Sequence, residues 1–201
     1  MRVSGTEGYA ETADRLAEQY ESRRFADVHK SILPLIPTTP CRVLDIGAGT
    51  GRDAAGLAAM GHRVLAVEPT AEMRAHGRRL HSSSAIDWID DSLPELAQVH
   101  ARGERFDLVM MTAVWMHLDD AERRRGMAQV RSLIAPAGLL TLSLRHGPIP
   151  AGRRMFEVTS TETKALAAEH GLNVLVDRDR PSSFGAEGVW WSVLAFQAQD
   201  A

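Results

Sequence analysis

The stretch that decides the fold reads Val43-Leu44-Asp45-Ile46-Gly47-Ala48-Gly49-Thr50-Gly51-Arg52-Asp53-Ala54. An apolar run carries an acidic residue near its end, a glycine-rich turn follows, and small residues of helical composition come next. This order is typical of a buried strand that leads through a tight turn into the start of a helix. We therefore expect the remaining elements to build a sheet with this turn near its centre.

Downstream of the turn, apolar runs alternate with segments of helical periodicity, which predicts a parallel sheet covered by helices on both faces. The runs expected to form its strands cover residues 41–46, 63–68, 85–89, 106–111 and 139–144. The helices expected along this part of the chain cover residues 52–60, 70–80, 90–101, 119–134 and 159–170. Two final apolar runs, 172–177 and 189–196, have no helical segment between them, so we expect them to pair antiparallel.

Two more helices are expected upstream of the turn. Sparse apolar residues at helical spacing predict one helix over residues 9–21. A denser apolar stripe predicts another over residues 24–36, which Pro37 and Pro40 would end.

The composition narrows the class of protein. The chain has 201 residues, 44% of them hydrophobic, and a formal net charge of −3, so no basic excess points to nucleic acid or to an anionic membrane surface. The single cysteine, Cys41, excludes an internal disulfide framework. No secretory signal or membrane-spanning stretch is evident, which predicts a soluble cytoplasmic protein; the oligomeric state stays open.

The carboxyl ends of parallel strands meet at one edge of a sheet, where ligands bind. The segments expected at this edge are residues 47–51, Glu68, Asp90 with Asp91, residues 112–117, and Arg145 with His146. A dinucleotide site is disfavoured because the third glycine comes one residue early and Arg52 stands where that glycine is expected. A phosphate-binding P-loop is also disfavoured, because no Gly-Lys-Ser/Thr follows the turn.

S-adenosylmethionine fits these residues better, since it carries no phosphate. Asp45 is suited to its ammonium group, and Glu68 to the two ribose hydroxyls. Asp91 and the Ser92 N–H are suited to adenine, although Asp90 is adjacent and the choice between the two acids stays open. Tyr20 either closes over the cofactor or packs, as does Tyr9. The full set of expected cofactor-binding residues is Tyr20, Asp45, Gly47, Ala48, Gly49, Gly51, Arg52, Asp53, Glu68, Pro69, Met73, Asp91, Ser92, Leu93 and Val114.

With these motifs in order, the chain resembles a class I S-adenosylmethionine-dependent methyltransferase of the small single-domain bacterial type. The segments that carry the resemblance are residues 43–51, Val67-Glu68-Pro69, residues 91–94, residues 106–118, and residues 133–138, where Ala137 replaces a glycine. The resemblance implies an α/β, Rossmann-like, doubly wound sheet of seven strands in the order 3-2-1-4-5-7-6, with strand 7 antiparallel. It also implies one domain over residues 1–201, made of a helical cap (1–37), a cofactor-binding core (41–145) and a C-terminal helix with two strands (146–201).

The resemblance implies methyl transfer, and a small-molecule acceptor is expected because the chain is short and lacks a basic face. His117, Arg145 and His146 are candidates for a catalytic base or for binding an acidic substrate. A structural role for His117 is an equal alternative. No metal site is expected. Two other hypotheses stay open: a non-catalytic module that binds S-adenosylmethionine, and an NAD(P)-dependent oxidoreductase.

Overall fold

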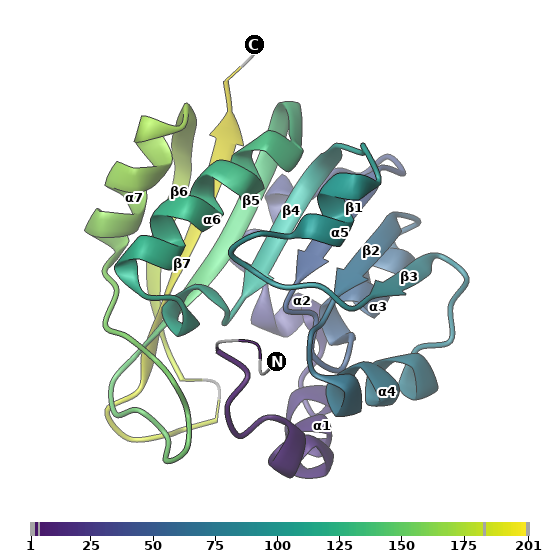
Figure 1. The fold of residues 1–201 in the computed structure, drawn as a ribbon, viewed down its shortest axis with the longest axis vertical. Helices are drawn as coiled ribbons and strands as arrows, with labels where there is room; N and C mark the ends of the chain where they lie inside the picture. Colours follow the sequence, from purple (N-terminus) through teal and green to yellow (C-terminus); the bar gives the residue numbers. More distant parts are fainter. Residues whose placement is uncertain (1–2, 4, 183, 200–201) are drawn as a thin grey trace.

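A computed structural model describes residues 3, 5–182 and 184–199. The outermost residues of the expected helical cap and of the C-terminal part (1–2, 4 and 200–201), like residue 183, lie outside the described residues. The described chain forms a seven-stranded sheet in the order β3-β2-β1-β4-β5-β7-β6, with helices on both faces (Figure 1). This confirms the expected strand order.

The strands give the sheet its polarity. They are β1 (Arg42–Ile46), β2 (Arg63–Val67), β3 (Ile86–Ile89), β4 (Phe106–Thr112), β5 (Ile134–His146), β6 (Leu172–Pro181) and β7 (Trp190–Ala198). The pairs among β1 to β5 are parallel, whereas β7 runs antiparallel to both β5 and β6. The carboxyl ends of β1 to β5 therefore meet at one edge, the lower edge in Figure 1.

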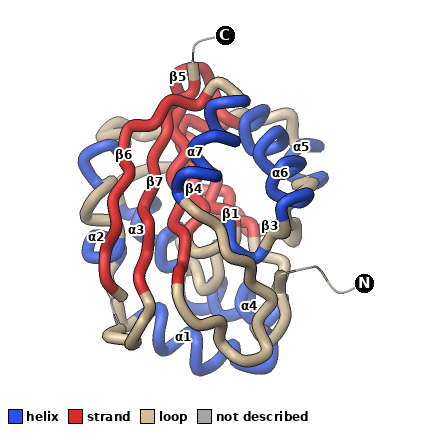
Figure 2. The backbone as a smooth tube through the Cα atoms, turned by 90° about the vertical axis from the view of Figure 1, so that its left-hand side faces the viewer, coloured by secondary structure: helices blue, strands red, loops and turns tan. Residues whose placement is uncertain are grey.

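The helices cover two faces and this lower edge. They are α1 (Ala13–Glu21), α2 (Phe25–Val28), α3 (Arg52–Ala59), α4 (Ala71–Leu80), α5 (Ala97–Ala101), α6 (Asp120–Leu133) and α7 (Ser160–Glu169), with 3-10 turns at Ala10–Thr12, Leu33–Leu35 and Trp115–His117. Figures 1 and 2 show α5, α6 and α7 on one face, α2 and α3 on the other, and α1 with α4 at the lower edge. The short N-terminal segment crosses this edge as well (Figure 1).

Alternation along β1 explains why both faces of the sheet are covered. Leu44 and Ile46 point into the larger core cluster, which includes residues of α6 and α7, while Val43 points into the cluster that includes residues of α2 and α3. All three side chains are fully buried. Burial of such a side chain stabilises the fold by about 1.5–3 kcal/mol.

Two expected helices are shorter than predicted. The helix expected over 24–36 is broken into α2 and a 3-10 turn at Leu33–Leu35, because Pro34 has no N–H to donate and its ring interferes with the preceding turn. The helix expected over 90–101 is reduced to α5, because residues 90–96 form a loop. The Asp91 carboxylate accepts the Gln98 and Val99 N–H groups and so satisfies the start of α5.

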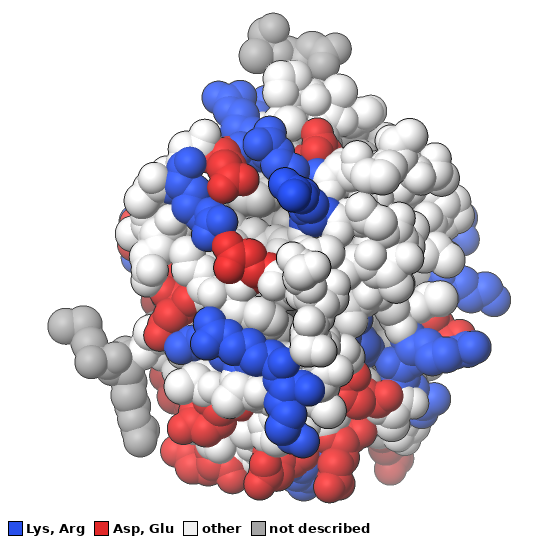
Figure 3. Space-filling view, turned by 90° about the vertical axis from the view of Figure 1, so that its right-hand side faces the viewer, with Lys and Arg blue, Asp and Glu red and all other residues white. Residues whose placement is uncertain are grey.

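The surface agrees with the balanced composition. The face seen in Figure 3 carries acidic and basic side chains side by side, with acidic ones gathered toward the end at which α1 lies. No helix in the described part of the chain is long and apolar enough to span a membrane. Within the same residues, no group of three or more His, Cys, Asp or Glu side chains is placed to hold a metal ion.

Candidate functional site

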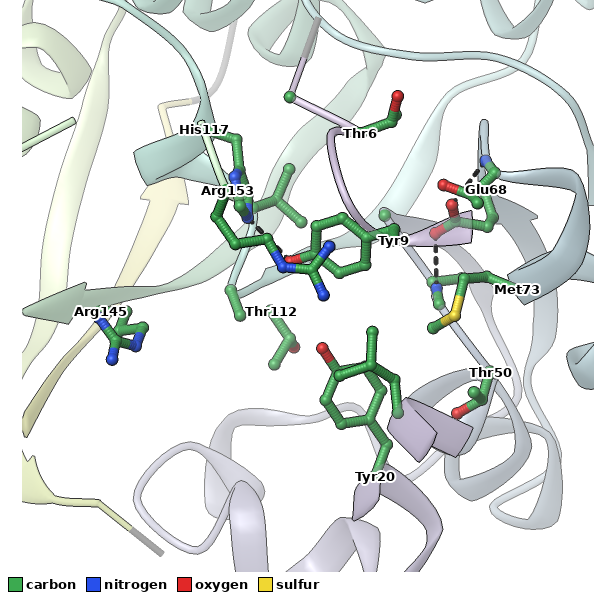
Figure 4. Close-up of a pocket in the computed structure, with 18 of the residues that line it drawn as sticks. Thr6, Tyr9, Tyr20, Thr50, Glu68, Met73, Thr112, His117, Arg145 and Arg153 are labelled. Carbon is green, nitrogen blue, oxygen red and sulfur yellow. Dashed lines mark hydrogen bonds between the residues drawn. The ribbon is translucent and has the colours of Figure 1, made fainter. Parts of the chain in front are cut away.

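A cavity of about 570 Å³ opens at the carboxyl edge of the sheet. This volume lies within the range of about 300–1,000 Å³ that is typical of small-ligand sites. The cavity reaches from Glu68 and Met73 on one side to Arg145 on the other, with Tyr9, Tyr20 and Thr112 between them (Figure 4). Glu21 holds α1 in place beside it, because its two carboxylate oxygens contact the Thr50 hydroxyl at 2.6 Å and His81 Nε2 at 3.2 Å.

The structure brings most of the predicted site residues together. The expected cofactor-binding residues that line the cavity are Tyr20, Asp45, Gly47, Ala48, Gly49, Arg52, Asp53, Glu68, Pro69, Met73, Asp91, Ser92, Leu93 and Val114. Gly51 does not line it. A Cβ at Gly51 would lie 2.7 Å from Cζ2 of Trp88, so this glycine is needed for packing against Trp88 and not for approach to a ligand.

Asp45 presents a buried carboxylate with an unused acceptor. The residue is 1% exposed, and its Oδ2 has no hydrogen-bond partner among the described residues. Burial raises the pKa of Asp45 well above its ordinary value, and the nearby Asp53 and Glu68 carboxylates raise it further. The N–H of Ala54 opposes this rise, so Asp45 also supports the start of α3. A cationic ligand group at this carboxylate would supply the missing partner.

Glu68 is held in position by the backbone of the glycine turn. Its Oε2 accepts the Gly49 N–H at 2.9 Å and its Oε1 accepts the Thr70 N–H at 2.8 Å. Burial raises the pKa of Glu68, and these two N–H groups partly offset the rise. Each carboxylate oxygen has further acceptor capacity, which suits a ligand with two neighbouring hydroxyls.

The glycines leave room where a ligand would need it. Gly49 has φ +58°, and a Cβ there would point into the cavity, 3.7 Å from Cε of Met73 and 3.9 Å from the Tyr20 ring. At Gly47, with φ +70°, a Cβ would lie 2.4 Å from Cγ2 of Val114. The glycines of this turn therefore allow the side chains of Met73 and Val114 to lie close to its backbone.

Asp53 and Arg52 are already paired with protein groups. Asp53 Oδ1 accepts from Nε of Arg52 at 2.7 Å, and its Oδ2 accepts from Nε2 of His29 at 2.8 Å. Burial alone would raise the pKa of Asp53, but His29 and Arg52 outweigh it and lower the pKa. Both residues line the cavity, yet the carboxylate of Asp53 is committed to joining α2 to α3.

Asp90 and Asp91 differ in their contacts. The Asp90 carboxylate is 62% exposed and pairs with Arg74 at 2.9 Å, away from the cavity. Asp91 lines the cavity, but its oxygens accept the N–H groups of Ser92, Gln98 and Val99. Asp91 therefore lines the cavity and also holds the shape of the loop that would face adenine.

The Tyr9 hydroxyl and Nε2 of His117 lie 3.0 Å apart, a pairing that the sequence analysis did not find. Nδ1 of His117 donates to the Arg154 carbonyl at 2.7 Å, so Nε2 is the acceptor and Tyr9 donates to it. The Arg153 guanidinium covers the Tyr9 ring at 3.8 Å. Burial lowers the pKa of His117 and raises that of Tyr9. Both ring nitrogens of His117 thus have partners, which favours a structural role in this state.

Arg145 and His146 lie on opposite faces of β5. Arg145 is paired in register with Trp191 of β7, and both line the cavity. His146 is paired with Trp190, stacks on its ring at 3.7 Å, and donates to the Ser192 hydroxyl at 2.9 Å. Successive strand residues alternate in direction, so the expectation that both side chains reach the site was wrong for His146.

Comparison with known proteins supports the same family. The family described as "Methyltransferase domain" matches residues 43–138. An uncharacterized methyltransferase of Geobacillus kaustophilus is 29% identical over 141 residues, which are 68% of this chain and 63% of that protein. One of Mycobacterium tuberculosis is 29% identical over 130 residues, 61% of this chain and 47% of that protein. The chain thus spans less than two thirds of the length of these two relatives.

Solved structures share the fold. The 1,6-didemethyltoxoflavin-N1-methyltransferase of Burkholderia thailandensis superposes with a TM-score of 0.66 at 23% identity, covering 100% of this chain and 92% of that one. The N-methyltransferase NodS of Bradyrhizobium japonicum, solved with S-adenosyl-L-homocysteine, gives 0.72 at 17% identity and covers 94% and 97%. Strand order, the glycine turn and the domain match agree, and residues 43–138 therefore form a methyltransferase domain with the class I, Rossmann-like fold.

Proposed function

We propose that this chain binds S-adenosylmethionine in the cavity at the carboxyl edge and transfers its methyl group to a small-molecule acceptor. The observation that carries the proposal is the buried Asp45 carboxylate, whose Oδ2 has no partner among the described residues, beside the glycine turn that holds Glu68. The methyltransferase-domain match over residues 43–138 makes S-adenosylmethionine the expected cofactor.

The side chains and backbone groups of the cavity match the chemistry of this cofactor. Asp45 would accept from the cofactor's ammonium group, and Glu68 from the ribose hydroxyls. The open space at Gly49 would admit the amino-acid part, with Met73 and Leu93 as apolar walls for the adenine. The N–H groups at the start of α3 favour a carboxylate.

When bound, S-adenosylmethionine supplies a sulfonium methyl group, which an acceptor lone pair takes up while the carbon–sulfur electron pair stays on sulfur. The chain's own part is to align the two reactants and to exclude water. Alignment of this kind is worth effective molarities of about 10⁵–10⁸ M. No protein nucleophile is required, which agrees with a site whose His117 is fully hydrogen-bonded.

The cavity continues beyond the cofactor residues, which favours an enzyme over a module that only binds the cofactor. Arg145 lines the far end, so the cavity has room beyond the end where Glu68 lies (Figure 4). A seal made by Tyr9, Trp115 and Arg145 together would favour a binding module, but Trp115 is buried in the core and does not line the cavity. The Burkholderia enzyme, solved with 1,6-didemethyltoxoflavin and S-adenosylhomocysteine, supports a small acceptor by analogy.

Calorimetric titration with S-adenosylhomocysteine and S-adenosylmethionine tests the proposal. Wild type is expected to bind both, and Glu68→Gln to bind at least about tenfold more weakly, because one charged acceptor is lost and an amide NH₂ faces a backbone N–H. Glu72→Gln, an exposed change on α4, is the matched control and should bind like wild type. Absence of binding at millimolar ligand would overturn the proposal.

A further inference from the structure

Three side chains from three adjacent strands form a row at the far end of the cavity. Arg145 of β5 and Arg180 of β6 are each paired in register with Trp191 of β7. Side chains paired in this way lie on the same face of a sheet. All three line the cavity, and the Arg180 guanidinium lies 5.5 Å from the centre of the Trp191 ring. The row thus places one arginine on each side of Trp191 in the sheet.

Arg145 has no acidic partner in the described part of the chain. Its guanidinium donates one N–H to the Pro148 carbonyl at 2.8 Å. The other N–H groups of this planar guanidinium are suited to donate hydrogen bonds to a carboxylate. Burial lowers the pKa of Arg145 and also that of Arg180, as expected for positive charges drawn partly out of water.

Arg153 adds a third guanidinium to the cavity wall. It donates to the Glu7 carbonyl at 2.9 Å and to the Thr12 hydroxyl at 2.9 Å, and no carboxylate lies within ion-pair distance of it among the described residues. Its positive charge therefore adds to that of the row. It also stands over Tyr9, between the row and Glu68 (Figure 4).

The two ends of the cavity differ in charge. Asp45 and Glu68 stand at the end assigned to the cofactor, whereas Arg145 stands at the other. The sulfonium cofactor is cationic and fits the acidic end. By the same electrostatic reasoning, an anionic ligand fits the basic end. The indole and the neighbouring Val189 and Met155 supply apolar surface there.

We propose that the methyl acceptor is a small aromatic carboxylate, whose carboxylate binds Arg145 in the row formed with Trp191 and Arg180. This inference rests on the proposed function, since it assigns the acceptor half of the same cavity. Arg145 then acts by binding and orienting the acceptor, and its planar fork favours two parallel hydrogen bonds to the carboxylate.

Benzoate and its neutral analogue benzamide are suitable probes, each added at millimolar concentration to the protein saturated with S-adenosylhomocysteine. Ligand-observed NMR measures their binding. Benzoate is expected to bind and benzamide to bind at least about tenfold more weakly, the ratio expected for a charge-assisted hydrogen bond. Arg145→Gln should weaken benzoate binding by a similar factor, and Arg145→Lys by less.

Arg178→Gln is the matched control, because it removes the same charge two residues from Arg180 at an exposed position that does not line the cavity. It should bind benzoate like wild type. S-adenosylhomocysteine affinity, measured first in every variant, checks that the fold and the cofactor end are intact. Benzoate binding that is equal in wild type and Arg145→Gln, or no better than benzamide binding, overturns this inference. Loss of S-adenosylhomocysteine binding in wild type would overturn the proposed function instead.

Discussion

The hydroxyl of Tyr9 lies 3.0 Å from Nε2 of His117, although 108 residues separate the two in the chain. The same histidine contacts the N-terminal segment a second time, since a Cβ at Gly5 would lie 3.0 Å from Cβ of His117. Together with the Arg153 bonds to Glu7 and Thr12, these contacts fasten the N-terminal segment across the cavity.

Tyr9→Phe should loosen this segment. The change leaves Nε2 of His117 as a buried acceptor without its donor, which costs about 1–3 kcal/mol. Because this segment contains only a 3-10 turn at Ala10–Thr12, we expect local opening and not global unfolding. Hydrogen exchange of amides in residues 5–12 should accelerate about tenfold or more. Unchanged exchange in this segment would contradict the prediction.

His117 makes the same contact sensitive to acid. Burial lowers its pKa below the ordinary value of 6.5, and the nearby Arg153 and Arg154 also disfavour its charged form, whereas Glu7 and the Arg154 carbonyl favour it. The folded protein therefore binds fewer protons than the unfolded chain in this region, and stability is complete above pH 6.5 and falls as the pH drops below it. An NMR titration should give His117 a pKa below 6.5. The variant His117→Asn should lack this part of the pH dependence of stability. A pKa of His117 at or above 6.5 would contradict the prediction.

Asp45→Asn should stabilise the ligand-free protein at neutral pH and weaken its binding of S-adenosylmethionine. The pKa of Asp45 is raised in the folded state, so the native protein holds a proton that the unfolded chain releases from about pH 3.8 upward. Between pH 3.8 and the raised pKa of Asp45, the free energy of unfolding therefore decreases as the pH rises. Calorimetric melting at several pH values should give the variant a higher Tm than wild type at pH 7. A lower Tm at every pH would contradict this account.

His146→Ala should leave cofactor binding unchanged. Its ring stacks on Trp190 and contacts Ser192 on the face of β5 that is turned away from the cavity. We expect S-adenosylhomocysteine affinity within about twofold of wild type, the size of an ordinary surface effect. A tenfold loss in a stably folded variant would return His146 to the list of site residues.

Two helical glycines offer a matched test of packing. A Cβ at Gly77 of α4 would lie 2.1 Å from the Trp88 ring, whereas one at Gly126 of α6 would have its nearest neighbour, Cδ2 of Leu93, at 3.4 Å. Gly77→Ala should destabilise the protein by about 1–3 kcal/mol through overpacking. Gly126→Ala should be neutral or stabilising by up to about 1 kcal/mol, because alanine is the better helix former. Chemical denaturation measures both, and equal effects would refute the packing account.

The residues that line the Glu68 end of the cavity were largely predictable because their signals are local. The turn at residues 47–51 and the acid at Glu68 each follow an apolar run, and a parallel sheet brings strand ends together whatever its exact register. The row of Arg145, Trp191 and Arg180 depends on register between strands that are far apart in sequence, so only the position of Arg145 at the edge could be expected.

The features of the site that the sequence did not indicate depend on contacts between distant residues and on loop shapes. No local pattern links Tyr9 to His117, and a tyrosine in a thin apolar stripe suits packing equally well. The direction of His146 follows from strand alternation once β5 is known to extend to that residue, but the sequence placed the end of the strand earlier. The backbone contacts of Asp91 depend on the loop that replaces the first part of the expected helix.

Because β7 is antiparallel to β5, the two ends of the cavity come from different parts of the chain. The insertion of β7 beside β5 brings the side chains of β6 and β7 to the far end of the cavity, while the glycine turn and Glu68 come from elements before β4. A substitution in β6 or β7 therefore changes the surface offered to an acceptor without altering the backbone that holds the cofactor.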